Sequence, residues 1–153
     1  NTFTIVDLDG NTYRPEVFAN ADITVINIWA TDCSPCVHEL PDINELAAQY
    51  KDKGLQIIGV CSGSLGKLYS SQDADTKKQI EKEFSELVEA LGLNNYVQGV
   101  PSDEFGLDLL ANVLAVYPTT VVVDSNGEVI DAFAGSQKKA EWAAKFDGYI
   151  AKE

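Results

Sequence analysis

The chain has 153 residues, of which 11 are basic and 24 acidic, and its formal net charge is −13. An acidic surface repels phosphate backbones, so the charge argues against nucleic-acid binding. The hydrophobic share of 45% and the length suit one globular domain covering residues 1–153. No apolar run approaches the roughly 18 residues of a membrane span. The chain begins at Asn1 and contains no methionine, so we expect that a preceding segment has been removed.

The first half of the chain has the hydrophobic pattern of a strand–helix–strand unit. Phe3 to Asp7 alternates like an edge strand, whereas Ile23 to Ala30 is a continuous apolar run typical of a buried strand. From Pro35 to Lys53 apolar residues recur every three or four positions, which predicts a helix ended by Gly54. Leu55 to Cys61 is predicted to form the next strand. The short joints favour parallel pairing of the two apolar strands.

The second half is predicted to add one helix to this unit and then complete the sheet. An extra helix at Asp73 to Leu91 follows the second core strand, within an insertion spanning roughly residues 62–96. The other expected elements are a loop at 62–72, an extended piece at 94–103, a helix at 104–116, a hairpin of strands 119–124 and 128–134, and an amphipathic helix at 138–151. The pattern predicts a single α/β domain.

The cysteines carry the clearest chemical signal. Cys33 and Cys36 form a Cys-x-x-Cys pair where the buried strand meets the first helical turn, and Cys61 stands alone. Free N–H groups and the helix dipole favour a thiolate at that position. In such settings the pKa of a cysteine falls from about 8.5 to between about 3.5 and 7.5. We predict that Cys33 attacks a substrate disulfide and that Cys36 resolves the mixed disulfide, with Pro35 suited to the first turn.

Other interpretations of the cysteines remain open at this point. Cys-x-x-Cys is also half of a zinc site, which Cys61 and His38 could complete, although His38 projects away from the pair. A purely structural bridge is a second alternative, but closing so short a loop stabilises little. Cys61 itself is expected to be a buried, inert packing residue, with a third redox thiol near the active-site loop as the alternative.

Four features together resemble one protein family. They are the Asn-x-Trp-Ala-Thr-x-Cys-x-Pro-Cys string at 27–36, Glu39, Leu40-Pro41, and Tyr117-Pro118-Thr119-Thr120. This combination resembles the thioredoxin superfamily and, more narrowly, the extracytoplasmic TlpA/ResA-like thiol–disulfide oxidoreductases. The resemblance implies a thioredoxin-like fold, with a central mixed β-sheet flanked by helices.

The resemblance also implies roles for individual residues. Tyr117-Pro118 would be a cis peptide facing the cysteine pair, and Pro118 and Glu39 would join Cys33 and Cys36 in the catalytic site. On spacing alone Glu39 would be a solvated helix charge. We expect the flanking residues to tune the redox chemistry or to contact substrate: Trp29, Asp32, Ser34, Pro35 and Tyr117.

The implied activity is reduction of protein disulfides with a redox-active disulfide and no bound cofactor. The resemblance further implies an extracytoplasmic bacterial protein, anchored through an N-terminal segment absent from this chain and reduced by a membrane thiol–disulfide donor. The alternative functions are a redox-inactive binding module and a copper- or zinc-binding protein using the same cysteines. Asp32 departs from the family, in which tryptophan is usual, and its charge should weaken the activation of Cys33 without abolishing it.

Overall fold

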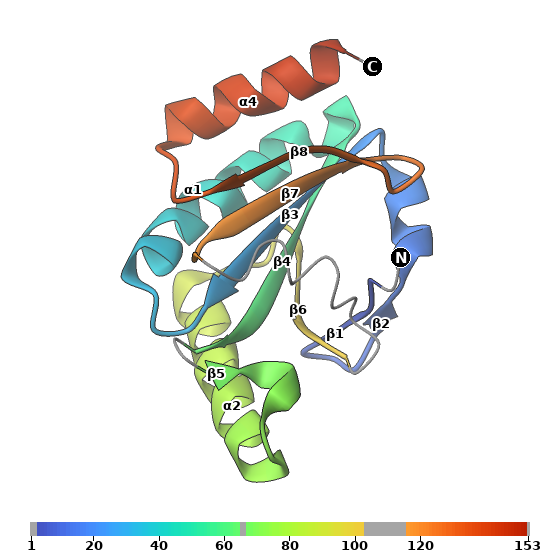
Figure 1. The fold of residues 1–153 in the computed structure, drawn as a ribbon. Coiled ribbons are helices and arrows are strands. Elements are labelled where there is room, and N and C mark those ends of the chain that lie inside the picture. Colours follow the sequence, from blue (N-terminus) through green and yellow to red (C-terminus); the bar gives the residue numbers. More distant parts are fainter. Residues whose placement is uncertain (1–2, 65–66, 103–115, 153) are drawn as a thin grey trace.

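The structure, a computed structural model, describes residues 3–64, 67–102 and 116–152 (Figure 1). Within them lies one mixed sheet of eight strands, in the order β2-β1-β6-β4-β3-β7-β8, with β5 paired to β4. The strands are β1 (Ile5–Asp7), β2 (Thr12–Tyr13), β3 (Ile23–Ala30), β4 (Leu55–Ser64), β5 (Lys67–Leu68), β6 (Val97–Pro101), β7 (Thr119–Asp124) and β8 (Val129–Ala134).

The centre of the sheet is the predicted strand–helix–strand unit. Every residue of β3 is buried, as its unbroken apolar run requires. β3 pairs in parallel with β4 on one side and antiparallel with β7 on the other, so the expected mixed sheet is confirmed. Between β3 and β4 the chain forms α1 (Ser34–Tyr50) and a short 3-10 turn, and it then leaves through Gly54 at a φ of 83°.

Two expectations about the strands were wrong. β1 is an inner strand, because the turn at Asp9-Gly10 brings β2 back to pair with it and leaves β2 at the edge. Residues 62–72 are not all loop: β4 continues to Ser64, pairs antiparallel with β5, and is followed by the 3-10 turn η3 (Tyr69–Ser71). The helix expected at 104–116 falls almost entirely outside the described residues.

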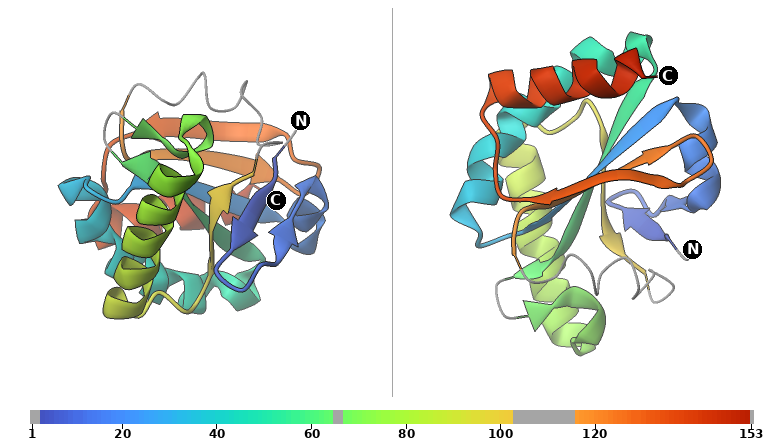
Figure 2. Two further views of the ribbon diagram at one scale, coloured as in Figure 1. Left: turned by 90° about the horizontal axis from the view of Figure 1, so that it is seen from below. Right: turned by 45° about the horizontal axis from the view of Figure 1, so that its top comes forward.

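Helices cover one face of the sheet and the N-terminal segment packs on the other. α1, the inserted α2 (Ala74–Leu91) and the C-terminal α4 (Lys139–Ala151) pack their apolar residues on the face that carries Val25 and Trp29. Phe3 and Phe18, the latter from the 3-10 helix η1 (Pro15–Asn20), cover the opposite face. Figure 2 shows this arrangement from two further directions. Among the described residues no helix combines the length and apolarity that crossing a membrane requires.

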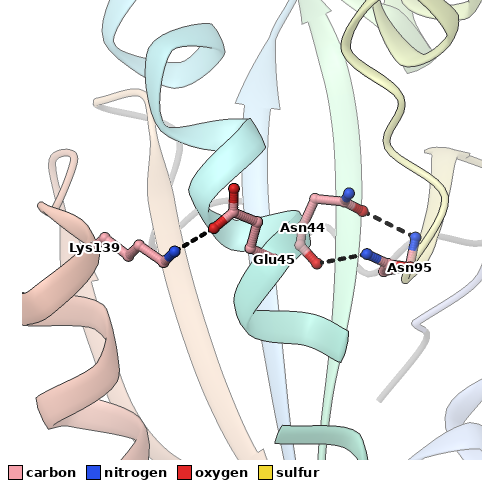
Figure 3. Close-up of polar contacts among 4 residues, drawn as sticks. All are labelled: Asn44, Glu45, Asn95 and Lys139. Carbon is pink, nitrogen blue, oxygen red and sulfur yellow. Dashed lines mark hydrogen bonds and ion pairs between the residues drawn. The ribbon is translucent and has the colours of Figure 1, made fainter. Parts of the chain in front are cut away.

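Polar contacts attach α1 to α4 on one side and to the segment that follows α2 on the other (Figure 3). Glu45 of α1 forms an ion pair with Lys139 in the first turn of α4. On its other flank, Asn44 accepts the backbone N–H of Asn95 at 2.9 Å and donates to the carbonyl of Gly92, where α2 ends. α1 therefore has fixed neighbours on both sides, which matters because its N-terminus carries the cysteine pair.

Candidate active site

Cys33 and Cys36 are joined by a disulfide at the N-terminus of α1, with their Cα atoms 5.3 Å apart. Cys33 is the N-cap residue, and its Sγ accepts the backbone N–H of Cys36 at 3.3 Å. Pro35 occupies the first turn, where no N–H is needed. The first-turn N–H groups and the helix dipole therefore meet the sulfur of Cys33, the arrangement that stabilises a thiolate.

The two sulfurs differ in their access to solvent. Cys33 is 4% exposed and Cys36 is fully buried. The residues around Cys33 in the chain, Asp32, Ser34 and Pro35, are all exposed. This difference and the exposed neighbours favour approach of a disulfide from the Cys33 side, which is the order of attack and resolution predicted from the sequence.

Cys61 is a free thiol in the core. It is fully buried, and its Sγ donates to the carbonyl of Gly63 at 3.7 Å. Burial raises the pKa of Cys61 to about 12, and the charges of Glu83 and Asp32 act in the same direction. A thiol this weakly acidic is a poor nucleophile, so the expected inert packing role fits and the third redox thiol does not.

Glu39 is a buried carboxylate at the centre of a hydrogen-bond network. Only 2% of it is exposed, so the solvated charge that spacing alone indicates was wrong. Its Oε1 accepts the backbone N–H of Gln137 and the indole N–H of Trp142, each at 3.0 Å. Burial raises the pKa of Glu39; the hydrogen bonds from Gln137, Trp142 and Asn27 oppose that rise, and the nearby charge of Asp42 adds to it.

A row of polar residues crosses the sheet beneath Glu39. Thr120 of β7 pairs with Asn27 of β3, Asn27 pairs with Gly59 of β4, and Gly59 pairs with Gln98 of β6. The three polar members are at most 5% exposed. Asn27 and Thr120 were expected only as parts of a motif, and Gln98 was not among the expected site residues. The one available signal for Gln98 was a polar residue inside an otherwise apolar strand.

Trp29 belongs to the wall of the site and cannot touch a substrate. It is completely buried, its ring lies 5.7 Å from that of Phe84 in α2, and its indole N–H donates to Gln98 Oε1 at 3.0 Å. Gln98 in turn donates to the hydroxyl of Tyr96 at 2.8 Å. Of the two roles expected of Trp29, complete burial rules out substrate contact and leaves tuning of the redox chemistry, and the side chain links the inserted helix to the polar row.

The Tyr117–Pro118 peptide bond is cis, as the resemblance implies. It immediately precedes Thr119, which pairs with Ile28 near the end of β3 that leads to the cysteines. The Tyr117 side chain packs against the apolar cluster that contains both cysteines, and its hydroxyl lies 2.6 Å from Ser62 Oγ. The structure thus brings the Tyr-Pro segment to the cysteine end of the sheet.

The zinc alternative has no support from the arrangement of ligands. The described residues contain no group of three or more histidine, cysteine, aspartate or glutamate side chains placed to hold a metal ion. His38 is exposed, whereas Cys61 is buried in the core. Cys61 packs in the apolar cluster that contains Cys33 and Cys36, but the exposed His38 does not join it, so in the described part of the chain these four residues do not form a zinc site.

Comparison with known proteins gives a consistent result. Residues 1–147 match the Redoxin family. The thiol-disulfide oxidoreductase ResA of Geobacillus kaustophilus is 30% identical over 139 residues, which cover 91% of this chain and 69% of that protein. ResA of Bacillus thuringiensis is 27% identical over an alignment of 155 residues, covering 98% of this chain and 73% of the relative.

A solved structure supports the fold independently of sequence. The thioredoxin-family thiol:disulfide interchange protein of Chlorobium tepidum superposes with a TM-score of 0.72 at 18% identity, covering 97% of this chain and 92% of that one. The expected thioredoxin-like fold is confirmed, as is the resemblance to TlpA/ResA-like proteins. The chain belongs to the Redoxin family, within the thioredoxin superfamily.

Proposed function

We propose that this chain is a thiol–disulfide oxidoreductase that reduces protein disulfides through Cys33 and Cys36. The observation that carries the proposal is the disulfide at the N-terminus of α1, in which Cys33 Sγ accepts a first-turn N–H group. The ResA relatives are named for the same activity.

The proposed reaction begins with the protein in its dithiol form. The Cys33 thiolate attacks one sulfur of the substrate disulfide, forms a mixed disulfide and releases the other substrate sulfur as a thiolate, which takes up a proton. Cys36 then loses its proton and attacks Cys33 Sγ. The second substrate sulfur leaves as a thiolate and takes up a proton, and the Cys33–Cys36 disulfide forms. Two electrons and two protons have passed from the protein to the substrate, so no bound cofactor is required.

Glu39 and Pro118 take supporting roles in this proposal. Glu39 lies one helical turn after Cys36, on the same side of α1. We propose that its carboxylate accepts the proton that Cys36 loses. Pro118 and Tyr117 present the start of β7 to the substrate chain. Asp32, Ser34 and Pro35 form the exposed rim around Cys33.

The reducing direction and the cellular setting rest on the family resemblance. We assign the chain an extracytoplasmic site of action, attachment to the membrane, and a membrane thiol–disulfide protein as electron donor. Labelling of Cys33 in intact cells with a membrane-impermeant thiol reagent tests the location. Labelling only after the cells are broken would contradict it.

Reduction of insulin disulfides in the presence of dithiothreitol tests the activity. Cys33→Ser and Cys36→Ser should both abolish it, whereas Cys61→Ala is the matched control and should retain it, because Cys61 is buried and its thiol is weakly acidic. Cys36→Ser should also accumulate a mixed disulfide through Cys33. Activity that survives Cys33→Ser, or a mixed disulfide on Cys36 in the Cys33 variant, would refute the assigned order.

A further inference from the structure

The side chain of Asn27 is held between Glu39 and Thr120. Its Nδ2 group donates to Glu39 Oε2 at 3.5 Å and to Thr120 Oγ1 at 3.3 Å. Its Oδ1 is buried and finds no hydrogen-bond partner in the described parts of the chain. Because an unpaired buried amide oxygen is costly, this orientation of the amide calls for a physical reason.

The two oxygens of Glu39 are bonded differently. Oε1 accepts two hydrogen bonds of 3.0 Å, from Gln137 and Trp142. Among the described residues, Oε2 accepts only the longer contact from Asn27. Since Oε2 has the more available lone pairs, a proton taken up by Glu39 binds there. The new O–H group then faces the N–H groups of Asn27, so that donor meets donor.

Half a turn of the Asn27 amide removes that conflict. Oδ1, which has no partner before the turn, then accepts the O–H of Glu39. The Thr120 hydroxyl can serve both orientations, because it accepts from Nδ2 in one and donates to Oδ1 in the other. The amide nitrogen and oxygen are nearly equal in size, so the surrounding packing admits both orientations.

Protons can reach Glu39 from solvent without passing the cysteines. A surface pocket of about 410 Å³ extends to Glu39 between α1 and the start of α4. The titratable or charged groups that face Glu39 come from three elements: His38 and Asp42 of α1, Lys138, Lys139 and Glu141 at the start of α4, and Tyr96 beside β6. Charges of both signs surround the pocket, so Glu39 can exchange its proton there.

We propose that Asn27 is a positioning residue that holds Glu39 in both protonation states, its side-chain amide turning when Oε2 gains or loses a proton. The inference rests on the proposed function, because the assigned proton transfer from Cys36 is what changes the state of Glu39. Asn27 touches neither substrate nor sulfur in this account. It keeps the carboxyl in one place while its charge changes.

Nuclear magnetic resonance of the oxidised protein tests the turn itself and requires no activity. Above the titration midpoint of Glu39, the Nδ2 protons of Asn27 should show Overhauser contacts to Glu39 and Thr120. Below the midpoint these contacts should weaken severalfold. In Glu39→Gln, whose side-chain amide donates to Oδ1, the turned orientation should persist at every pH. Overhauser contacts that stay constant in the wild-type protein across the midpoint would overturn the proposal.

The pH profile of insulin reduction tests whether the positioning matters for the reaction. Asn27→Leu keeps the shape but removes both the donor to the ionised carboxylate and the acceptor for its protonated form. The hydrogen bond to the charged form is the stronger of the two, so the pKa of Glu39 rises and the limb of the profile governed by Glu39 should move up by up to about one pH unit. Thr24→Val is the matched control, since Thr24 is buried on the same strand and bonded to Gln56 instead. It should leave the profile in place.

The outcomes separate the two proposals. An inactive wild-type protein would refute the proposed function and leave the resonance result to decide the behaviour of Asn27. An active protein whose profile does not move in Asn27→Leu, or moves equally in Thr24→Val, would refute the positioning role alone.

Discussion

Replacing Glu39 by glutamine should stabilise the folded protein at neutral and alkaline pH. Glu39 is 2% exposed, and burial raises its pKa above the ordinary 4.5. The folded protein therefore keeps this proton over a pH range in which the unfolded chain has already lost it. The stability contributed by the proton is fully present below about 4.5 and disappears as the pH rises through the folded-state pKa.

The size of the stability difference depends on how far burial raises the pKa of Glu39. Each unit of elevation corresponds to about 1.4 kcal/mol between the protonation states. Glutamine is neutral at every pH, and its Oε1 can accept the same two hydrogen bonds, from Gln137 and Trp142. We therefore expect Glu39→Gln to match the wild-type protein near pH 4 and to be the more stable of the two at pH 8, by about 1.4 kcal/mol for each unit by which burial raises the pKa of Glu39.

Urea unfolding of both proteins across this pH range measures the difference directly. Subtracting the two curves cancels the other carboxylates, which the proteins share. If the wild-type protein instead gains stability over Glu39→Gln as the pH rises, the hydrogen bonds to the carboxylate outweigh its burial. That result would refute the reasoning.

Three further substitutions test other parts of the account. Asp32→Asn should lower the pKa of the Cys33 thiol by less than about one unit, since a charge about 4 Å away in water contributes about 1 kcal/mol. The thiolate is titrated by ultraviolet absorbance, and an unchanged titration would contradict this prediction. Gly59→Ala should destabilise the protein by about 1–3 kcal/mol, because its Cβ would overlap the Gln98 amide, and unaltered urea unfolding would count against the polar row. Phe84 of α2 is only 1% exposed, so Phe84→Ala should lower the free energy of unfolding by about 3–5 kcal/mol. A thermal midpoint within about one degree of the wild-type value would show that α2 does not support the core.

Much of the fold was readable from the sequence because local signals agreed with the tertiary structure. The apolar run at Ile23–Ala30 is typical of a buried strand and forms one, and Gly54 ends the helical segment in the left-handed conformation that favours glycine. Asp73 caps α2 through the N–H of Thr76, so the predicted start of that helix was correct to one residue. The β1 error had a different origin, since which strand lies at the edge depends on a pairing that alternation cannot reveal.

The sequence predicted the parts of the site that lie close together in the chain, but not the contacts between residues far apart in sequence. The cysteines form a local motif, and their helix-terminal position follows from the strand–helix joint. The partners of Glu39 lie far away in sequence: Trp142 is 103 residues distant and Gln137 is 98. No periodicity indicates that an indole N–H from the C-terminal helix will meet a carboxylate of α1. Such contacts exist only once α4 has packed on the sheet.

The reduction potential of the Cys33–Cys36 pair tests the central claim most directly. The protein is equilibrated in glutathione or dithiothreitol buffers of graded potential, and the fraction of dithiol is read after alkylation. A protein-disulfide reductase should have a stable disulfide, with a potential of about −270 mV or below, the level of thioredoxin. A potential near about −120 mV, that of a strong oxidant, would contradict a protein-disulfide reductase.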